Sequence, residues 1–349
     1  MPDGRLDVGL GAPLPVVAGV DGSVASVAAA HEAAHEAVLR GAVLELVAVP
    51  RAEVPAPRGS ARAVPGAVDD LAAGLAELHP GLPVAARAVP GGPAGVLASL
   101  SREAGLLVLG ARGAGGRRAW ARGSVVGAVL RSARCPVLLG RRDTGLSGAA
   151  ARVVVVHAEG DLARALPLVD VALAAAARRG AALLVLRPYA PGPGEDAPRA
   201  LRRVRGVTAA LLDSLCLDLV PEHPVVTTVH TRDAGPSALA WHARDAEQVV
   251  VDAARLLDDG FTAVLAGLRA GVVAVPRGAR DRREGCLALY RQTLLAELAA
   301  TPRRGDGCRT PEELDDAWRV GTARPAVGTG VATAWQACLQ AAVDAGAVP

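Results

Sequence analysis

Residues 105–142 read GLLVLGARGAGGRRAWARGSVVGAVLRSARCPVLLGRR, and their pattern indicates the fold class. An apolar run at 106–110 is followed by a loop rich in Gly and Arg, then by an apolar stretch at 124–133 that predicts a helix. A second apolar run closes the segment at 136–140. Short, uninterrupted apolar runs are typical of strands buried on both faces, and their alternation with helices indicates a parallel sheet. The segment therefore predicts an α/β fold.

The same alternation extends upstream. A strand is predicted at 15–20, a turn at Asp21-Gly22-Ser23, a helix that ends at Gly41, and a second strand that ends near residue 49. A third strand at 83–89 and a helix at 94–104 lead into the segment above. Residues 14–142 therefore read as one domain, a five-stranded parallel sheet flanked by helices.

The pattern then recurs. VVVV at 153–156 and LLVLRP at 183–188 match the first two strands at an offset of 139 residues, and QVVVD at 248–252 matches the fourth strand. The simplest interpretation is a second copy at 152–277, with a linker near 143–151. Residues 278–349 lie outside the repeat and are predicted to form a helical C-terminal extension, with helices near 286–300, 311–320 and 332–344.

Composition excludes several classes of protein. The chain has no Lys, so it cannot be a P-loop nucleotidase, a protein kinase or a pyridoxal enzyme, each of which needs a lysine. Its five Cys are scattered without a C-x-x-C pair, which argues against a disulfide framework and a Cys-based zinc site. A net charge of +3 and 2% aromatic residues do not favour nucleic-acid binding.

We find neither a signal-peptide pattern at the N-terminus nor an apolar run of membrane-spanning length. We therefore expect a cytoplasmic protein without a membrane partner.

The candidate chemistry lies in the Gly/Arg loop. Gly110 and Gly113 let the backbone turn tightly and approach an anion. Gly123-Ser124 offers amides and a hydroxyl at a helix N-terminus, where the dipole favours phosphate. Residues 105–142 also hold eight Arg and no acidic residue. The physics alone leaves open a simpler interpretation, in which the loop is a flexible, solvated, Arg-rich segment.

The spacing is more specific than the composition. Gly110-Ala111-Arg112-Gly113, nine residues and Gly123-Ser124 resemble the nucleotide-binding motif of the universal stress protein family. VVAGVDGSVAS at 16–26 is similar to the first strand and turn of that family, and SARCPVLLGR at 132–141 to its closing strand. The resemblance implies an adenine nucleotide alpha hydrolase-like fold and an ATP site, with or without magnesium.

The family pattern then assigns the site residues. It implies that Asp21 and the backbone of Val49 contact the adenosine end of the nucleotide. The phosphates would be held by Gly110, Gly113, Gly123, Ser124 and the amide of Val125, and Arg112 within the motif is assigned to the same site. Ala48 departs from the family, which often has His there.

The second copy departs further. In the sequence alignment Asp21 becomes Gly160, Gly110 becomes Asp252 and Gly113 becomes Arg255, while Gly123-Ser124 becomes Asp258-Asp259. Carboxylates at a phosphate position would repel the ligand, so we expect a degenerate domain that binds no nucleotide. The family also pairs such domains through the last strand, which implies a homodimer or an intramolecular pseudo-dimer of the two copies.

One motif suggests a different function. His31-Glu32-Ala33-Ala34-His35 matches the H-E-x-x-H pattern of zinc hydrolases. A helix with a buried stripe of Val27, Ala30, Ala34, Ala37 and Val38 would instead leave His31 and His35 as ordinary surface residues, and we expect no metal site.

No general base or metal-ligand set accompanies the phosphate loop. The expected function is therefore regulatory ATP binding in a stress response, without enzymatic turnover. The alternatives are slow ATP hydrolysis and a zinc hydrolase that uses His31, Glu32 and His35.

Overall fold

The computed structural model describes residues 13–50, 65–110, 125–140, 153–214, 224–232, 235–265 and 267–277. The predicted C-terminal extension at 278–349 lies outside these residues. The first half of the chain alternates strands and helices in the order β1 (Val16–Val20), α1 (Val24–Arg40), β2 (Leu44–Ala48), α2 (Pro65–Leu78), β3 (Val84–Ala88), α3 (Pro93–Leu100), β4 (Leu106–Gly110), α4 (Val125–Ser132) and β5 (Val137–Gly140).

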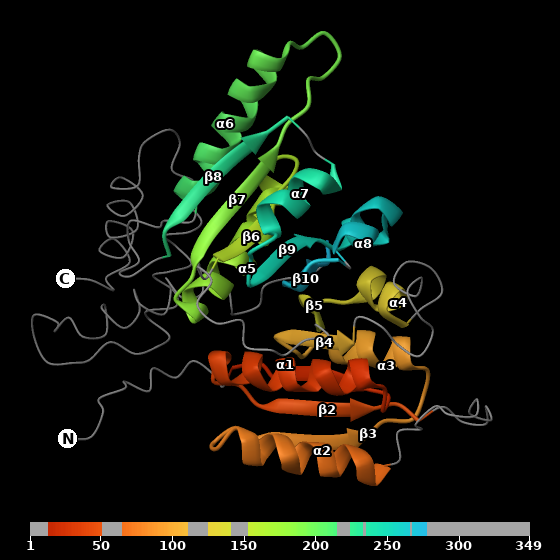
Figure 1. Ribbon diagram of the computed structural model, residues 1–349. Helices are drawn as coiled ribbons and strands as arrows, with labels where there is room; N and C mark the ends of the chain where they lie inside the picture. Colours follow the sequence, from red (N-terminus) through yellow and green to blue (C-terminus); the bar gives the residue numbers. More distant parts are fainter. Residues whose placement is uncertain are drawn as a thin grey trace, which may run out of the picture.

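The second half repeats this order (Figure 1). It contains β6 (Val153–His157), α5 (Leu162–Arg179), β7 (Ala182–Pro188), α6 (Ala197–Ser214), β8 (Val226–Thr231), α7 (Pro236–Ala243), β9 (Gln248–Asp252), the 3-10 helix η2 (Ala253–Leu257), α8 (Asp259–Leu265) and β10 (Gly271–Val275).

Local sequence explains how the long helices begin and end. Ser23 caps the N-terminus of α1, and its hydroxyl accepts a hydrogen bond from the Ser26 amide. Gly41 ends the helix in the left-handed conformation at φ 59°. Asp161 and Gly180 do the same for α5, the corresponding helix of the second half. Equivalent caps at both ends show that the two halves share one folding pattern.

The ten strands form one continuous sheet in the order β3-β2-β1-β4-β5-β10-β9-β6-β7-β8. All pairs within each half are parallel, whereas β5 and β10 pair antiparallel at the centre. We call this central pair the seam. It joins two five-stranded parallel sheets, so the α/β architecture predicted from the sequence is confirmed.

The seam is close to a local two-fold axis. Leu138 faces Val273, and the flanking pairs are Leu139 with Val272 and Val137 with Ala274. When the closing segments of the two copies are superposed by sequence, Leu138 and Val273 are equivalent positions. The halves therefore meet as two copies of one subunit would meet in an isologous dimer.

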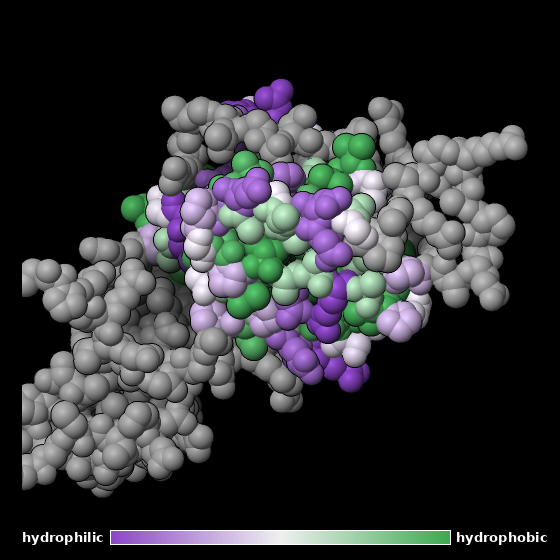
Figure 2. Space-filling view, turned by 90° about the horizontal axis from the view of Figure 1, so that it is seen from below, coloured by the Kyte–Doolittle hydropathy of each residue, from purple (hydrophilic) through white to green (hydrophobic). Residues whose placement is uncertain are grey.

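Helices cover both faces of the sheet. On one face α1, α2, α5 and α6 pack on an apolar cluster that includes Leu46 and Leu183. On the other face α3, α4, α7 and α8 cover a second cluster that continues across the seam. Seen from the end that carries α2, the surface mixes hydrophilic and apolar residues (Figure 2).

Several local expectations need correction. The helix expected at 94–104 ends at Leu100, and α2 and α6 form in segments where no helix was predicted. The predicted stripe of α1 is right for its alanines but wrong for Val38, which is 50% exposed. Glu36 is buried instead, because charged groups from the second half surround it.

Candidate functional site

Three predicted site residues meet at one edge of the first half. β1 lies between β2 and β4, with Val20 opposite Ala48 and Gly19 opposite Leu109. Asp21, Val49 and Gly110 are the next residues on these three parallel strands, so all lie at the carboxyl edge. The chain leaves β1 to β2 on one side and later returns to β4 on the other. In open α/β sheets, ligands bind at this kind of topological switch point.

Asp21 begins a compact hydrogen-bonded turn. Its Oδ1 accepts from the Ser23 amide at 3.0 Å, and its own amide donates to Ser26 Oγ at 3.2 Å. Ser26 Oγ in turn donates to the Ser23 carbonyl at 2.9 Å. Partial desolvation would raise the pKa of Asp21, but the hydrogen bonds from Ser23 and Ser26 outweigh it and hold the pKa below its usual value. The turn therefore presents a fixed, ionised hydrogen-bond acceptor at the carboxyl edge of the sheet.

Gly110 allows β4 to approach the start of α1. A Cβ at this position would lie 2.8 Å from the carbonyl carbon of Ala25 and 2.9 Å from the amide nitrogen of Ser26. Only glycine fits against this first helical turn. The sequence motif led us to expect a glycine that faces an anion, and the structure adds a packing role.

The remaining site residues follow in the loop and helix after β4. Val125 is the first residue of α4, so its amide belongs to the N-terminal turn of that helix. Arg112, Gly113, Gly123 and Ser124 lie outside the described residues, and their assignment stays a prediction.

The structure changes the alignment of the second half. Ser23 and Asp161 are the N-caps of α1 and α5, and the preceding Gly22 and Gly160 have nearly equal φ angles of 78° and 79°. The counterpart of Asp21 is therefore Glu159, not Gly160. Since α5 has 18 residues and α1 has 17, the offset changes within the helix. Before this change of offset, the sequence alignment was wrong by one residue.

At the corresponding edge of the second half, side chains bind groups of the same half. Arg255, at the position of Gly113, forms an ion pair with Glu159. Arg187, which is 1% exposed and aligns with Ala48, donates to the carbonyl oxygens of Ala158 and Gly160 at 2.7 and 2.9 Å. The residues at the positions of Asp21 and Gly113 therefore form an ion pair with each other in the second half.

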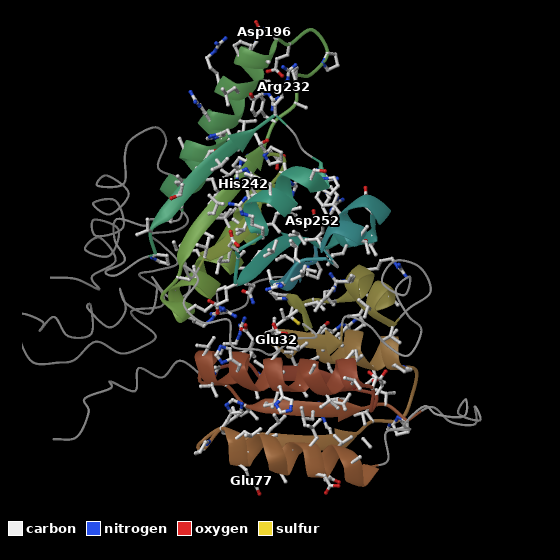
Figure 3. All side chains as sticks on the ribbon, viewed as in Figure 1. Glu32, Glu77, Asp196, Arg232, His242 and Asp252 are labelled. Carbon is white, nitrogen blue, oxygen red and sulfur yellow. The ribbon has the colours of Figure 1, made fainter. Side chains whose placement is uncertain are left out.

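The acidic residues of this region have local partners as well. Asp252 accepts from the Ala254 amide at 2.8 Å, and Asp258 accepts from the Gly260 amide at 2.9 Å at the start of α8. Arg164 and Arg277 approach Asp252 at 3.8 and 3.6 Å. Asp252 lies at the end of β9, as Figure 3 shows. These carboxylates stabilise turns and helix ends, a role that the sequence alignment did not predict.

Near the Glu159–Arg255 ion pair, the pKa of His157 is strongly shifted. It is 2% exposed, and its ring lies 5.4 Å from that of Phe261. Burial lowers its pKa to about 4; nearby Glu159 opposes this, while Arg255 and Arg187 add to it. His157 is therefore neutral near pH 7. No motif indicated this residue in the sequence.

The residues of the H-E-x-x-H motif lie on α1. His35 is exposed, whereas Glu32 lies on the side of α1 toward the seam (Figure 3). Cβ atoms added at the paired seam residues Gly140 and Gly271 would lie 3.3 and 2.8 Å from its carboxylate oxygens. Among the described residues, no three His, Cys, Asp or Glu side chains are placed to share an ion.

Within the part of the chain that the structure describes, no helix is long and apolar enough to span a membrane.

A buried ion cluster links the halves near the seam. Glu36 of α1 pairs with Arg179 of α5 and with Arg40, and Gln248 of β9 donates to it at 3.3 Å. Burial would raise the pKa of Glu36, but Arg179, Arg40 and Arg178 hold it below the usual value. Sequence periodicity missed this cluster, because its members are far apart along the chain.

Fold and site together define an α/β protein of two similar halves, with the candidate site at the switch point of the first half. Residues 14–141 match the model of the universal stress protein family. The universal stress protein Rv2005c of Mycobacterium tuberculosis is 35% identical over 138 residues, which cover 37% of this chain and 46% of the relative. The chain therefore carries a universal stress protein domain and spans about half the length of the curated relatives it matches.

Solved structures extend the comparison. A universal stress protein from Archaeoglobus fulgidus aligns with 76% of this chain and 97% of its own, at 14% identity and a TM-score of 0.49. A universal stress protein solved in complex with cAMP is 29% identical and covers 38% of this chain and 99% of its own, with a TM-score of 0.29.

Proposed function

We propose that the first half binds ATP at the carboxyl edge of β1, β2 and β4, and that the protein acts as a regulatory module in a stress response. The observation that carries the proposal is the meeting of Asp21, Val49 and Gly110 at the switch point. The family motif begins at this same Gly110 and leads into α4. Parallel sheets of this kind bind nucleotides at the edge where these residues lie.

The residues suit the two ends of the ligand. The ionised Asp21 would accept hydrogen bonds from ribose hydroxyls or the adenine amine. The backbone of Val49, the residue after β2, follows a residue paired with the end of β1. The phosphates would lie toward the N-terminal turn of α4, where backbone amides and the helix dipole favour anions. Magnesium, when present, would neutralise phosphate charge.

A binding role without turnover is supported by the chemistry of the loop. Hydrolysis needs a group that orients or deprotonates the attacking water, and residues 105–142 contain neither acidic residues nor His. The output proposed here is a change of conformation or interaction on binding ATP.

Calorimetric titration of the full chain with ATP tests the binding site. Gly113→Asp adds volume and negative charge to the phosphate loop, and we expect it to abolish binding while the fold persists. Gly206→Asp is the matched control, because Gly206 is an exposed residue of α6 whose added Cβ would meet nothing within 4 Å. Equal affinity in both variants would remove the loop from the site.

Turnover is measured separately, by phosphate release from ATP at saturating nucleotide. We expect ATP to dissociate from the site many times before any of it is hydrolysed. Multiple turnovers per site that disappear in Gly113→Asp would make the protein a hydrolase instead.

A further inference from the structure

We propose that the Glu159–Arg255 ion pair of the second half positions α4 and thereby sets the nucleotide affinity of the first half. The inference rests on the proposed ATP site and adds a residue pair that regulates it. Neither residue belongs to the first half, and neither is expected to touch the nucleotide.

The ion pair fixes η2 relative to the second sheet. Arg255 lies within this five-residue helix, while Glu159 follows β6. The Arg255 guanidinium also stacks on the Phe261 ring of α8, 4.9 Å from its centroid. At the start of η2, Asp252 caps the Ala254 amide. Three contacts from three different elements therefore hold this short segment.

The same short segment packs against α4 across the seam. Leu256 of η2 is fully buried, and it belongs to the same apolar cluster as Val129 and Leu130 of α4. Since α4 has only eight residues, its orientation depends on the helices that it contacts, α3 and η2.

This packing connects the ion pair to the proposed phosphate site. The N-terminal residue of α4 is Val125, whose amide is assigned to the phosphates, and Val129 lies one helical turn further on. Hydrogen bonds to phosphate depend steeply on distance and angle, so a small displacement of α4 weakens them. Loss of the ion pair frees η2 and removes the support that aligns this helix end.

Thermodynamic linkage gives the inference a second consequence. If an intact ion pair favours ATP binding, ATP must favour the intact ion pair by the same factor. ATP should therefore slow hydrogen exchange in η2 as well as in α4, although η2 belongs to the other half.

The test is the ATP affinity of full-length variants, measured by calorimetric titration. Glu159→Gln and Arg255→Met each break the pair with little change in volume, and we expect ATP affinity to fall about tenfold, within the usual range of coupling between sites. Glu195→Gln is the matched control, since it breaks the Glu195–Arg203 ion pair in the same half but away from α4. It should leave the affinity unchanged.

Two further variants separate positioning from general destabilisation. Arg255→Lys keeps the charge and should retain most of the affinity, and the exchanged pair Glu159→Arg with Arg255→Glu should recover part of what either single change loses. Faster hydrogen exchange in α4, with the exchange of β1 and β2 unchanged, should accompany the loss. Should Arg255→Met fail to fold, Glu159→Gln decides the question.

Wild-type affinity in the folded Glu159→Gln and Arg255→Met variants would overturn the inference. So would an equal loss in the Glu195→Gln control, which would indicate a general effect of destabilising the second half. Failure of the proposed function is distinct: the wild-type chain would then not bind ATP, and the exchange rates of α4 in the variants would still show whether the pair holds that helix.

Discussion

At the scale of single residues, the contact between Gly110 and α1 predicts a large effect from one methyl group. Gly110→Ala should lower the free energy of unfolding by about 1–3 kcal/mol, because its Cβ would overlap backbone atoms of Ala25 and Ser26 that cannot move without shifting the helix. Denaturant unfolding measures the change. ATP affinity should fall as well, since the Asp21 turn packs on the same residues.

Gly74→Ala is the control for this substitution. Gly74 lies within α2, and a Cβ there would meet nothing within 4 Å, so the change should stabilise the protein by up to about 1 kcal/mol through helix propensity. A Gly110→Ala variant with an unchanged free energy of unfolding would contradict the close packing described here.

The buried imidazole of His157 predicts a loss of stability in acid. The unfolded chain takes up a proton near pH 6.5, whereas folded His157 stays neutral until about pH 4, because burial and the neighbouring Arg255 and Arg187 oppose the charge. The unfolded state therefore binds more protons between these values. Stability should fall by on the order of 2 kcal/mol from pH 7 to pH 5, and the contribution is fully present above pH 6.5.

His157→Leu isolates this contribution from other titrating groups. Urea unfolding of wild type and variant at pH 7, 6 and 5 gives two slopes, and the wild-type slope should be the steeper one. Parallel pH profiles would mean that His157 takes up its proton in the folded state as readily as in the unfolded state.

At the scale of elements, α1 and α5 are joined by the buried ion pair of Glu36 and Arg179. Glu36→Ala leaves Arg179 buried without its principal carboxylate, and such losses cost about 3–5 kcal/mol. We expect a large drop in the midpoint of urea unfolding. Hydrogen exchange should also become faster at the β5–β10 seam, since the cluster joins the halves beside it.

Arg87→Ala provides the comparison at an exposed ion pair. Arg87 and Glu45 are 48% and 26% exposed and lie at 2.8 Å on neighbouring strands, so solvent screens their interaction. The cost should stay below about 1 kcal/mol. A cost at Glu36 as small as that at Arg87 would show that water reaches the cluster.

At the scale of the whole molecule, two copies of one fold should provide a single nucleotide site. In the second half Glu159 and Arg255 neutralise each other, and Arg187 donates to two backbone carbonyls of the adjoining turn. A triphosphate would have to displace all three. Equilibrium dialysis at saturating ATP should therefore reach a plateau near one nucleotide per chain.

A plateau near two would contradict this interpretation of the second half. In that case Gly113→Asp should remove one nucleotide and leave the other, which would place the remaining site in residues 152–277. The stoichiometry thus shows whether the second half binds a nucleotide, whatever the affinity of the first half.

Much of the architecture could be predicted from local sequence. Apolar runs such as those at 106–110 and 248–252 form buried parallel strands, because only strands covered on both faces tolerate so few polar residues. The turn at Asp21 and the caps at Ser23 and Gly41 follow from preferences that act over a few residues. Family resemblance in residues 14–142, which the family model confirms, added the candidate site.

Only the tertiary structure decided which distant residues meet. The burial of Glu36 and the packing of η2 on α4 depend on a sheet that pairs β5 with β10. The equivalence of Glu159 with Asp21 follows from the matching caps and turns before α1 and α5. Hydrophobic periodicity encodes which face of an element is apolar, but it does not encode the partner of a buried charge. The strands, most helices and the loop motif could be recognised from the sequence. Electrostatic and packing energies depend on distance in space, so the contacts between the two halves depend on the fold.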